Sequence, residues 1–139
     1  HRFEIFLKKN SKTSINDSKA TSFEATRSAL ANLSNIYWIL GGLPKKNDKV
    51  ELSKFKKNII KCYLIGKSTN FFKKQIQEKI DFSITKNLKN TIIKILKDIK
   101  LRKKGKKNIL LSPSAASFDQ FSNFEKRGEA FKSLCNKYA

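Results

Sequence analysis

Ile36-Tyr37-Trp38-Ile39-Leu40 is a continuous apolar run, and Gly41-Gly42 closes it. A strand with one wet face alternates apolar and polar residues, whereas a strand covered on both faces is apolar at every position. The run therefore predicts a strand inside a sheet that carries helices on both faces.

The segments on either side of this run alternate between strand and helix patterns. Upstream, residues 2–7 and 13–16 are expected strands, and Thr21 stands three residues before Glu24, as in a capping box at the start of a helix. Downstream, we expect helices at 50–58, 69–78, 88–101 and 123–138, and strands at 59–65, 80–84 and 108–111. This order predicts a Rossmann-like three-layer α/β sandwich with about six strands, mostly parallel with an antiparallel edge strand.

The bulk composition places limits on the class of protein. A chain of 139 residues with 39% hydrophobic content is expected to form a single globular domain over residues 1–139. No apolar run approaches the roughly 20 residues needed to cross a bilayer, so we expect no membrane partner and a cytoplasmic location. We also expect a monomer. Because the chain begins with His1 and contains no methionine, we expect it to be part of a longer polypeptide.

The net charge of +20 raises the hypothesis of a basic nucleic-acid-binding α/β module. The positive charge comes from 27 Lys and only 4 Arg, alongside 12 Asn. Recognition of base edges and bidentate contacts with phosphate favour Arg. The excess of Lys along the whole chain indicates solvated faces, so no specific nucleic-acid partner is expected, and this class stays as the alternative.

Three polar segments follow expected strands, at 16–21, 41–45 and 112–121. In parallel α/β sheets ligands gather outside the carboxyl ends of the strands. In the first segment Asp17 offers an acceptor for hydroxyls, Lys19 a mobile cation for phosphates, and Thr21 a hydroxyl at a helix start. The pattern is typical of a nucleotide or carboxylate site.

Each segment also has a purely structural interpretation. Thr21 is then only a helix cap, Gly41-Gly42 only a tight strand exit with Lys45 as one solvated lysine among many, and Ser117 only a loop hydroxyl. A scaffold of this fold without a ligand is thus a third hypothesis. The joint occurrence of three such segments at strand ends favours a site.

The start of the last helix permits a sharper expectation. Ser122 and Glu125 form a second capping box, which leaves the N–H groups of Asn123 and Phe124 without helical partners. Free donors at the positive end of a helix favour a carboxylate. The hydroxyl of Ser117 is available to the same anion.

Several chemistries have no support in the sequence. No G-x-x-x-x-G-K-[ST] loop occurs, and His1 is the only histidine, so no Ser-His-Asp or Cys-His set is credible. Cys62 and Cys135 lie far apart without a CxxC spacing, which predicts buried reduced thiols. We expect no metal site in this chain. The domain has the features of one half of a site whose other half another part of the protein supplies.

The same segments, in this order, resemble the Mur ligase family, in its D-glutamate-adding type. The likeness extends over nearly the whole chain, although Pro44 stands where the family commonly has glycine. The matching residues are His1-Arg2-Phe3-Glu4, Asn16-Asp17-Ser18-Lys19-Ala20-Thr21, Leu40-Gly41-Gly42 with Lys45, Leu111-Ser112-Pro113, Ala116-Ser117-Phe118-Asp119-Gln120-Phe121, and Asn123-Phe124-Glu125 with Arg127-Gly128.

The resemblance implies the C-terminal domain of a three-domain ligase whose central domain is a P-loop ATPase. Such an enzyme uses ATP and Mg²⁺ to convert UDP-N-acetylmuramoyl-L-alanine to an acyl phosphate, which the amine of D-glutamate attacks during peptidoglycan synthesis. By motif, Arg2, Asp17 and Lys19 then meet the nucleotide, with Lys19 also catalytic. The residues implied for D-glutamate are Thr21, Lys45, Ser117 and the backbone N–H of Phe124.

Overall fold

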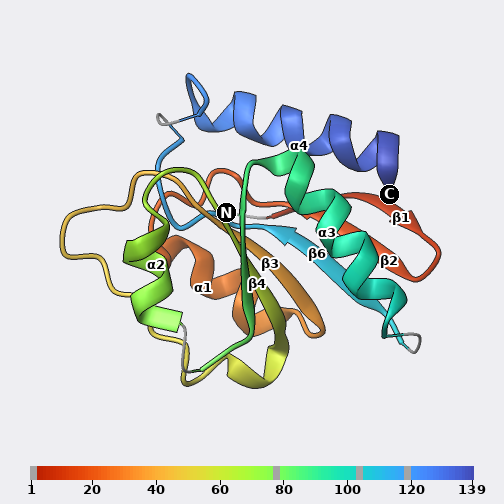
Figure 1. Cartoon of the computed structure of the whole chain (residues 1–139), viewed down its shortest axis with the longest axis horizontal. Coiled ribbons are helices and arrows are strands. Elements are labelled where there is room, and N and C mark those ends of the chain that lie inside the picture. The colour runs from red at the N-terminus through yellow and green to blue at the C-terminus, as the bar shows by residue number, and fades with distance from the viewer. Residues whose placement is uncertain (1–2, 77–78, 103–104, 118–119) are drawn as a thin grey trace.

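The computed structural model describes residues 3–76, 79–102, 105–117 and 120–139 (Figure 1). Within these residues the chain forms a six-stranded sheet in the order β1-β2-β6-β3-β4-β5. Strand β1 pairs antiparallel with β2, and all other neighbours pair in parallel, which confirms the predicted fold class. The strands are β1 Glu4–Lys9, β2 Lys12–Asn16, β3 Ile36–Gly41, β4 Ile59–Ile65, β5 Phe82–Lys86 and β6 Lys107–Leu111.

Helices cover both faces of this sheet (Figure 1). Helices α1 (Phe23–Asn32) and α2 (Thr69–Ile76) pack on one face, and α3 (Leu88–Lys100) and α4 (Phe124–Tyr138) pack on the other. Every residue of β3 is buried, and its side chains alternate between the two cores. This is the environment that the apolar run predicted. No helix among the described residues is long and apolar enough to span a membrane.

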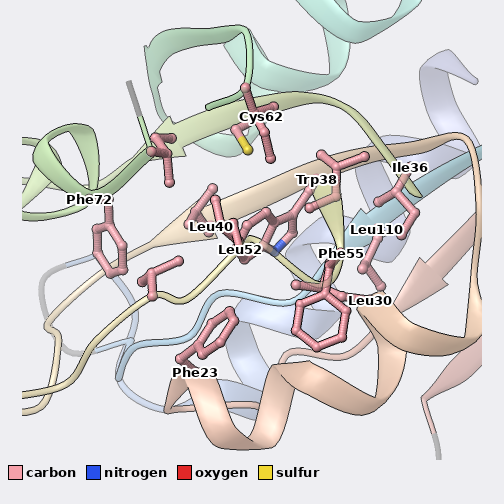
Figure 2. Packing of buried hydrophobic residues seen from close by; sticks show 14 of the residues in the cluster. Phe23, Leu30, Ile36, Trp38, Leu40, Leu52, Phe55, Cys62, Phe72 and Leu110 are labelled. Carbon is pink, nitrogen blue, oxygen red and sulfur yellow. The ribbon is translucent and has the colours of Figure 1, made fainter. Parts of the chain in front are cut away.

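The core beneath α1 and α2 is built around Trp38 of β3. Figure 2 shows the indole surrounded by aliphatic and aromatic side chains from β3, α1 and the segment that follows β3. The indole Nε1 donates a hydrogen bond of 2.8 Å to the carbonyl of Ser112, so the ring's polar atom is satisfied inside the core. This bond also fixes the backbone just after β6, where one of the polar segments begins.

The expected helix at 50–58 is wrong. The structure has turns there and only a 3-10 helix at Lys56–Asn58. Val50, Leu52 and Phe55 are buried, but their spacing of two and three residues suits no single face of an α-helix. The N–H of Val50 donates instead to the side chain of Gln75 in α2. Burial of three apolar side chains therefore holds this segment against the core without a helix.

Other boundaries differ by one or two residues. The strand expected at 80–84 is β5 at Phe82–Lys86, because the N–H of Ile80 still bonds to Ile76 after α2. The cap of α1 is Ser22 and not Thr21: the Ser22 hydroxyl accepts from the N–H of Ala25 at 3.3 Å. The cap of α4 is Asn123 and not the predicted Ser122: the Asn123 side chain accepts from the N–H of Lys126 at 2.8 Å.

Candidate functional site at the carboxyl ends of β2, β3 and β6

Asp17 follows β2 at the point where the parallel neighbour β6 ends. Its N–H donates a 2.7 Å bond to the carbonyl of Leu111, and its carboxylate Oδ2 accepts a 2.7 Å bond from the hydroxyl of Ser112. Only 3% of the residue is exposed. Burial raises the pKa of the Asp17 carboxyl to about 6, and the Ser112 hydrogen bond opposes that rise. Asp17 is therefore held in one orientation, and its pKa lies above the usual range of an aspartate.

The two glycines after β3 lie against neighbouring backbone. A Cβ on Gly41 would lie 2.1 Å from the Ile65 carbonyl oxygen, and one on Gly42 would lie 2.3 Å from that of Ala116. Both glycines also have φ above +130° (+134° and +132°), a region that L side chains rarely adopt. Only glycine fits at these two positions, so the strand exit is a close backbone crossing.

That crossing brings the second and third polar segments together. The N–H of Gly41 donates to the carbonyl of Pro113 at 3.0 Å, and Leu43 and Ala116 exchange two bonds of 2.9 Å. The N–H of Ser114 reaches the carbonyl of Ala20 at 3.0 Å. All three polar segments thus meet at one edge of the sheet.

The start of α4 lies beside the first segment. The hydroxyl of Ser18 donates to the carbonyl of Phe124 at 2.7 Å, although the two residues are 106 positions apart. Because Asn123 is the cap and its side chain binds the N–H of Lys126, the cap side chain does not bind the N–H groups of Phe124 and Glu125. The sequence had predicted the pair Asn123 and Phe124 instead. The N–H of Phe124 belongs to both sets.

Arg127 connects α4 to the loop after β2 and was given no role from the sequence. It is 1% exposed, and its guanidinium donates to the hydroxyl of Ser18 at 2.9 Å and to the carbonyl of Ser18 at 2.8 Å. The signal in the sequence was an arginine among the apolar positions of a helix face, directly before a glycine. That glycine, Gly128, admits the close approach of Asn16: an added Cβ would lie 2.8 Å from Asn16 Nδ2.

A hollow of about 290 Å³ opens between the loop after β2, the edge strand β1 and the first turns of α4. Glu4 lies at one side, where the Nζ of Lys132 is 3.0 Å from its carboxylate, and the hydrogen bond from Lys132 leads the effects that lower the pKa of Glu4. Carboxylates and amides that accept hydrogen bonds outnumber the cations on the lining. The lining residues are Glu4, Asn16, Asp17, Ser18, Lys19, Phe124, Glu125, Glu129 and Lys132.

The remaining predicted site residues are placed as follows. Lys19 is exposed and lines the same hollow, and Thr21 is half-buried between Ala20 and the cap of α1. Ser117 is 2% exposed, and its carbonyl accepts the N–H groups of Gln120 and Phe121. Lys45 is exposed on the loop after Leu43, and its carbonyl accepts the N–H of Asp48 in a local turn. Arg2 lies outside the described residues.

The described part of the chain contains no metal-ligand cluster and no reactive thiol. No group of three or more His, Cys, Asp or Glu side chains there is arranged to hold a metal ion. Cys62 and Cys135 are both buried free thiols, as predicted. Burial raises the pKa of the Cys135 thiol to about 12, so it stays protonated and unreactive at neutral pH.

No family model matches the sequence. Individual proteins, however, are similar to it over nearly its whole length. The chain is 40% identical over 131 residues, or 94% of its length, to the UDP-N-acetylmuramoylalanine–D-glutamate ligase of Rhizobium meliloti. It is 41% identical over 99% of its length to the protein of that name from Wolbachia sp. subsp. Brugia malayi, and 38% identical over 98% to that from Rickettsia conorii.

The chain belongs to the Mur ligase family. This confirms the resemblance that the motifs carried. The Mur ligase domain spans 28% of the Rhizobium meliloti relative and 27% of the other two, and it corresponds to their C-terminal domain.

Proposed function

We propose that this Mur ligase domain binds D-glutamate and closes over the nucleotide in an ATP-dependent ligase of peptidoglycan synthesis. The complete enzyme adds D-glutamate to UDP-N-acetylmuramoyl-L-alanine through an acyl phosphate. Its three domains include a central P-loop domain that binds most of the ATP and Mg²⁺. The names of the relatives, which pair UDP-N-acetylmuramoylalanine with D-glutamate, support the choice of the two substrates. The meeting of three polar segments at one sheet edge is the structural observation that carries the proposal.

Asp17 is assigned to the ribose hydroxyls of the nucleotide. A buried, oriented carboxylate is an acceptor, and the hollow beside it carries Glu4, Glu125 and Glu129 as well. A lining of carboxylates suits hydroxyl groups and repels phosphates. The ribose therefore belongs against Asp17, with the phosphates farther out. Arg2 keeps the nucleotide role that the resemblance implies.

Lys19 is assigned to the phosphates. It is exposed, lies two positions beyond Asp17 and lines the same hollow, and its flexible stem can follow a moving phosphoryl group. A cation placed where negative charge develops during transfer stabilises that transition state more than the ground state. Lys19 is thus the one residue of this domain proposed to act in catalysis.

The two carboxylates of D-glutamate are assigned to Thr21, Lys45, Ser117 and the N–H of Phe124. The paired backbone of Leu43 and Ala116 places the loop that carries Lys45 next to the segment that carries Ser117. The start of α4 adds oriented N–H groups, which favour an anion. A site shared between domains is completed on closure, so we expect weak glutamate binding and no turnover by this chain alone.

The proposal is tested by the coding sequence upstream of His1. A G-x-x-x-x-G-K-[ST] segment in the preceding few hundred codons would support a ligase with a central P-loop domain. A stop codon followed by a start next to His1 would contradict the enzymatic part of the proposal.

The alternative function is that of a basic nucleic-acid-binding module, and the observation that favours it is the net charge of +20. Contacts with phosphates lose affinity steeply as salt rises. Binding of a short duplex that persists at physiological ionic strength would favour the alternative. Binding that disappears there would reflect charge alone.

A further inference from the structure

The loop after β3 that carries Lys45 is tied to the start of α1 by the side chain of Asp48. Asp48 Oδ2 accepts a hydrogen bond of 3.0 Å from the N–H of Phe23, although 25 positions separate the two residues. The first N–H groups of a helix have no partner within the helix, and the helix dipole favours a carboxylate beside them. The bond therefore joins two segments to which the proposed function assigns contacts with D-glutamate.

The backbone of Asp48 closes the turn on which Lys45 lies. Its N–H donates to the carbonyl of Lys45 at 3.0 Å, and Asn47 inside the turn has a φ of +66°, a conformation that asparagine tolerates well. The second carboxylate oxygen of Asp48, Oδ1, accepts the N–H of Lys49 at 3.1 Å. Because both carboxylate oxygens and the N–H of Asp48 are engaged, the turn has a fixed orientation relative to the carboxylate.

Phe23 is a rigid point of attachment for this loop. It is 4% exposed, and its ring packs edge-on against Phe55 with 6.3 Å between the ring centroids. Figure 2 shows the ring of Phe23 directed into the core beneath α1 and α2. At its other end the loop begins at Leu43, which is paired with Ala116 by two bonds of 2.9 Å. Lys45 therefore lies between two anchored points of the backbone.

We propose that Asp48 is a positioning residue that holds Lys45 at a fixed spacing from Thr21 for the carboxylates of D-glutamate. This inference rests on the proposed function, because it deepens the role of Lys45. Thr21 comes two positions before Phe23, so the bond between Phe23 and Asp48 sets the spacing of the two segments. A lysine whose backbone is already fixed loses less conformational entropy when it binds an anion.

Three possible roles of Asp48 predict three different effects of its removal. A carboxylate on the loop repels the carboxylates of D-glutamate, so charge repulsion alone predicts tighter binding in Asp48→Ala. Capping of α1 alone predicts a less stable helix with unchanged affinity for D-glutamate. Only positioning of Lys45 predicts weaker binding. The sign of the change in affinity therefore separates the three roles.

The first readout is the steady-state kinetics of the complete gene product that contains this chain, with D-glutamate as the varied substrate. Asp48→Ala is expected to raise KM for D-glutamate about 3- to 10-fold with kcat nearly kept, because the turn is released while Lys45 remains. Asp48→Asn should stay within about twofold of the wild-type KM, because its amide oxygen still accepts the N–H of Phe23. An unchanged or lowered KM in Asp48→Ala, or an equal rise in Asp48→Asn, would overturn the proposal.

Ser22 provides a matched control at the same end of α1. Its hydroxyl accepts the N–H of Ala25 at 3.3 Å, so Ser22→Ala also removes a side-chain hydrogen bond from the helix start but leaves the loop tied. Ser22→Ala is expected to keep KM for D-glutamate within about twofold of the wild type. A rise equal to that of Asp48→Ala would show that the helix start alone sets KM, and would overturn the proposal.

A double-mutant cycle tests whether Asp48 acts through Lys45. In a Lys45→Ala background the further change Asp48→Ala is expected to alter KM for D-glutamate less than about twofold, because the side chain that it positions is gone. The same rise in KM in both backgrounds would overturn the proposal. Circular dichroism checks that each variant is folded, and Asp48→Leu, which keeps the branched shape without an acceptor, serves if Asp48→Ala does not fold.

Hydrogen exchange of the same proteins, followed by mass spectrometry, separates this inference from the proposed function. Exchange in the peptide over residues 44–50 is expected to quicken at least about threefold in Asp48→Ala and to stay at the wild-type rate in Asp48→Asn and Ser22→Ala. Quicker exchange in an enzyme whose wild type does not use D-glutamate would contradict the proposed function and leave the tie between loop and helix in place. Unchanged exchange in Asp48→Ala would contradict the tie whatever the enzyme does.

Discussion

The Asp17 carboxylate and the Ser112 hydroxyl lie 2.7 Å apart, although 95 positions separate the two residues in the sequence. The bond links the ends of two parallel strands at the candidate site. It also leaves a carboxyl group buried in a place where burial raises its pKa to about 6. The fold therefore keeps a group that costs stability when ionised, which is typical of functional positions.

The buried Asp17 predicts a definite dependence of stability on pH. Its native pKa of about 6 lies above the ordinary aspartate pKa of 3.8, so the native state holds this proton more tightly than the unfolded chain does. Its contribution is fully present below about pH 4 and is lost as the pH rises through about 6. Asp17→Asn is expected to remove about 1–2 kcal/mol of this pH-dependent change. Urea unfolding at pH 4, 5, 6 and 7 measures it.

The comparison for that prediction is wild type against Asp17→Asn at each pH. The variant is expected to be the more stable protein at pH 7, and the two free energies of unfolding should converge toward pH 4. Parallel curves that never converge would show that Asp17 does not titrate in this range.

Gly42 and Gly105 offer a matched pair for backbone strain. Both have positive φ, +132° and +86°, but a Cβ on Gly42 meets the Ala116 carbonyl at 2.3 Å and one on Gly105 meets nothing within 4 Å. Gly105→Ala is therefore expected to cost about 1 kcal/mol from φ alone. Gly42→Ala should cost at least about 3 kcal/mol, because the paired backbone of Leu43 and Ala116 must separate. Equal losses in chemical denaturation would refute the close crossing.

Arg127 is expected to stabilise the loop that carries Asp17 and Lys19. Arg127→Met removes two charge-assisted hydrogen bonds to Ser18 and should lower the free energy of unfolding by about 2–4 kcal/mol. Arg27→Met is the control, because Arg27 is a half-exposed partner of Glu24 and should cost less than about 1 kcal/mol. Hydrogen exchange at Ser18 and Lys19 should also increase in Arg127→Met. Similar losses in the two variants would contradict the role of Arg127.

Lys45 and its neighbour Lys46 provide a direct test of the D-glutamate assignment. In the complete gene product, Lys45→Ala is expected to raise KM for D-glutamate about 10- to 100-fold with little change in kcat, because a charge-assisted hydrogen bond to a carboxylate is lost. Lys46→Ala, which removes the same charge one residue along the same exposed loop, should leave KM unchanged. Equal effects of the two variants would show that only local charge matters.

Sequence patterns predicted those elements whose burial is periodic. The apolar run became β3, with alternate residues in the two cores, and α3 begins at the predicted residue because Asn87 caps it and its apolar residues recur at helical spacing. The helix predicted at 50–58 was wrong because packing against α2, and not a helical spacing of apolar residues, decides which three residues of this segment are buried. Helix starts shifted by one residue where adjacent polar residues compete for the cap, as at Thr21 and Ser22.

For the candidate site, the sequence predicted which strand ends carry polar residues, because that depends on local order alone. It did not predict the partners that hold them. Ser18 and Arg127 meet through contacts more than 100 positions apart (109 for Arg127), and the bond between Phe23 and Asp48 spans 25 positions from α1 to the loop after β3. Such contacts depend on the folded chain and have no local signature.

The most direct test of the central claim is an assay of the complete gene product that contains this chain. Phosphate release from Mg²⁺-ATP is measured with UDP-N-acetylmuramoyl-L-alanine, with and without D-glutamate, for wild type and Lys19→Ala. The account predicts release that requires D-glutamate and a kcat at least about 100-fold lower in Lys19→Ala. Release that is indifferent to D-glutamate, or a Lys19→Ala enzyme with wild-type kcat, would contradict it.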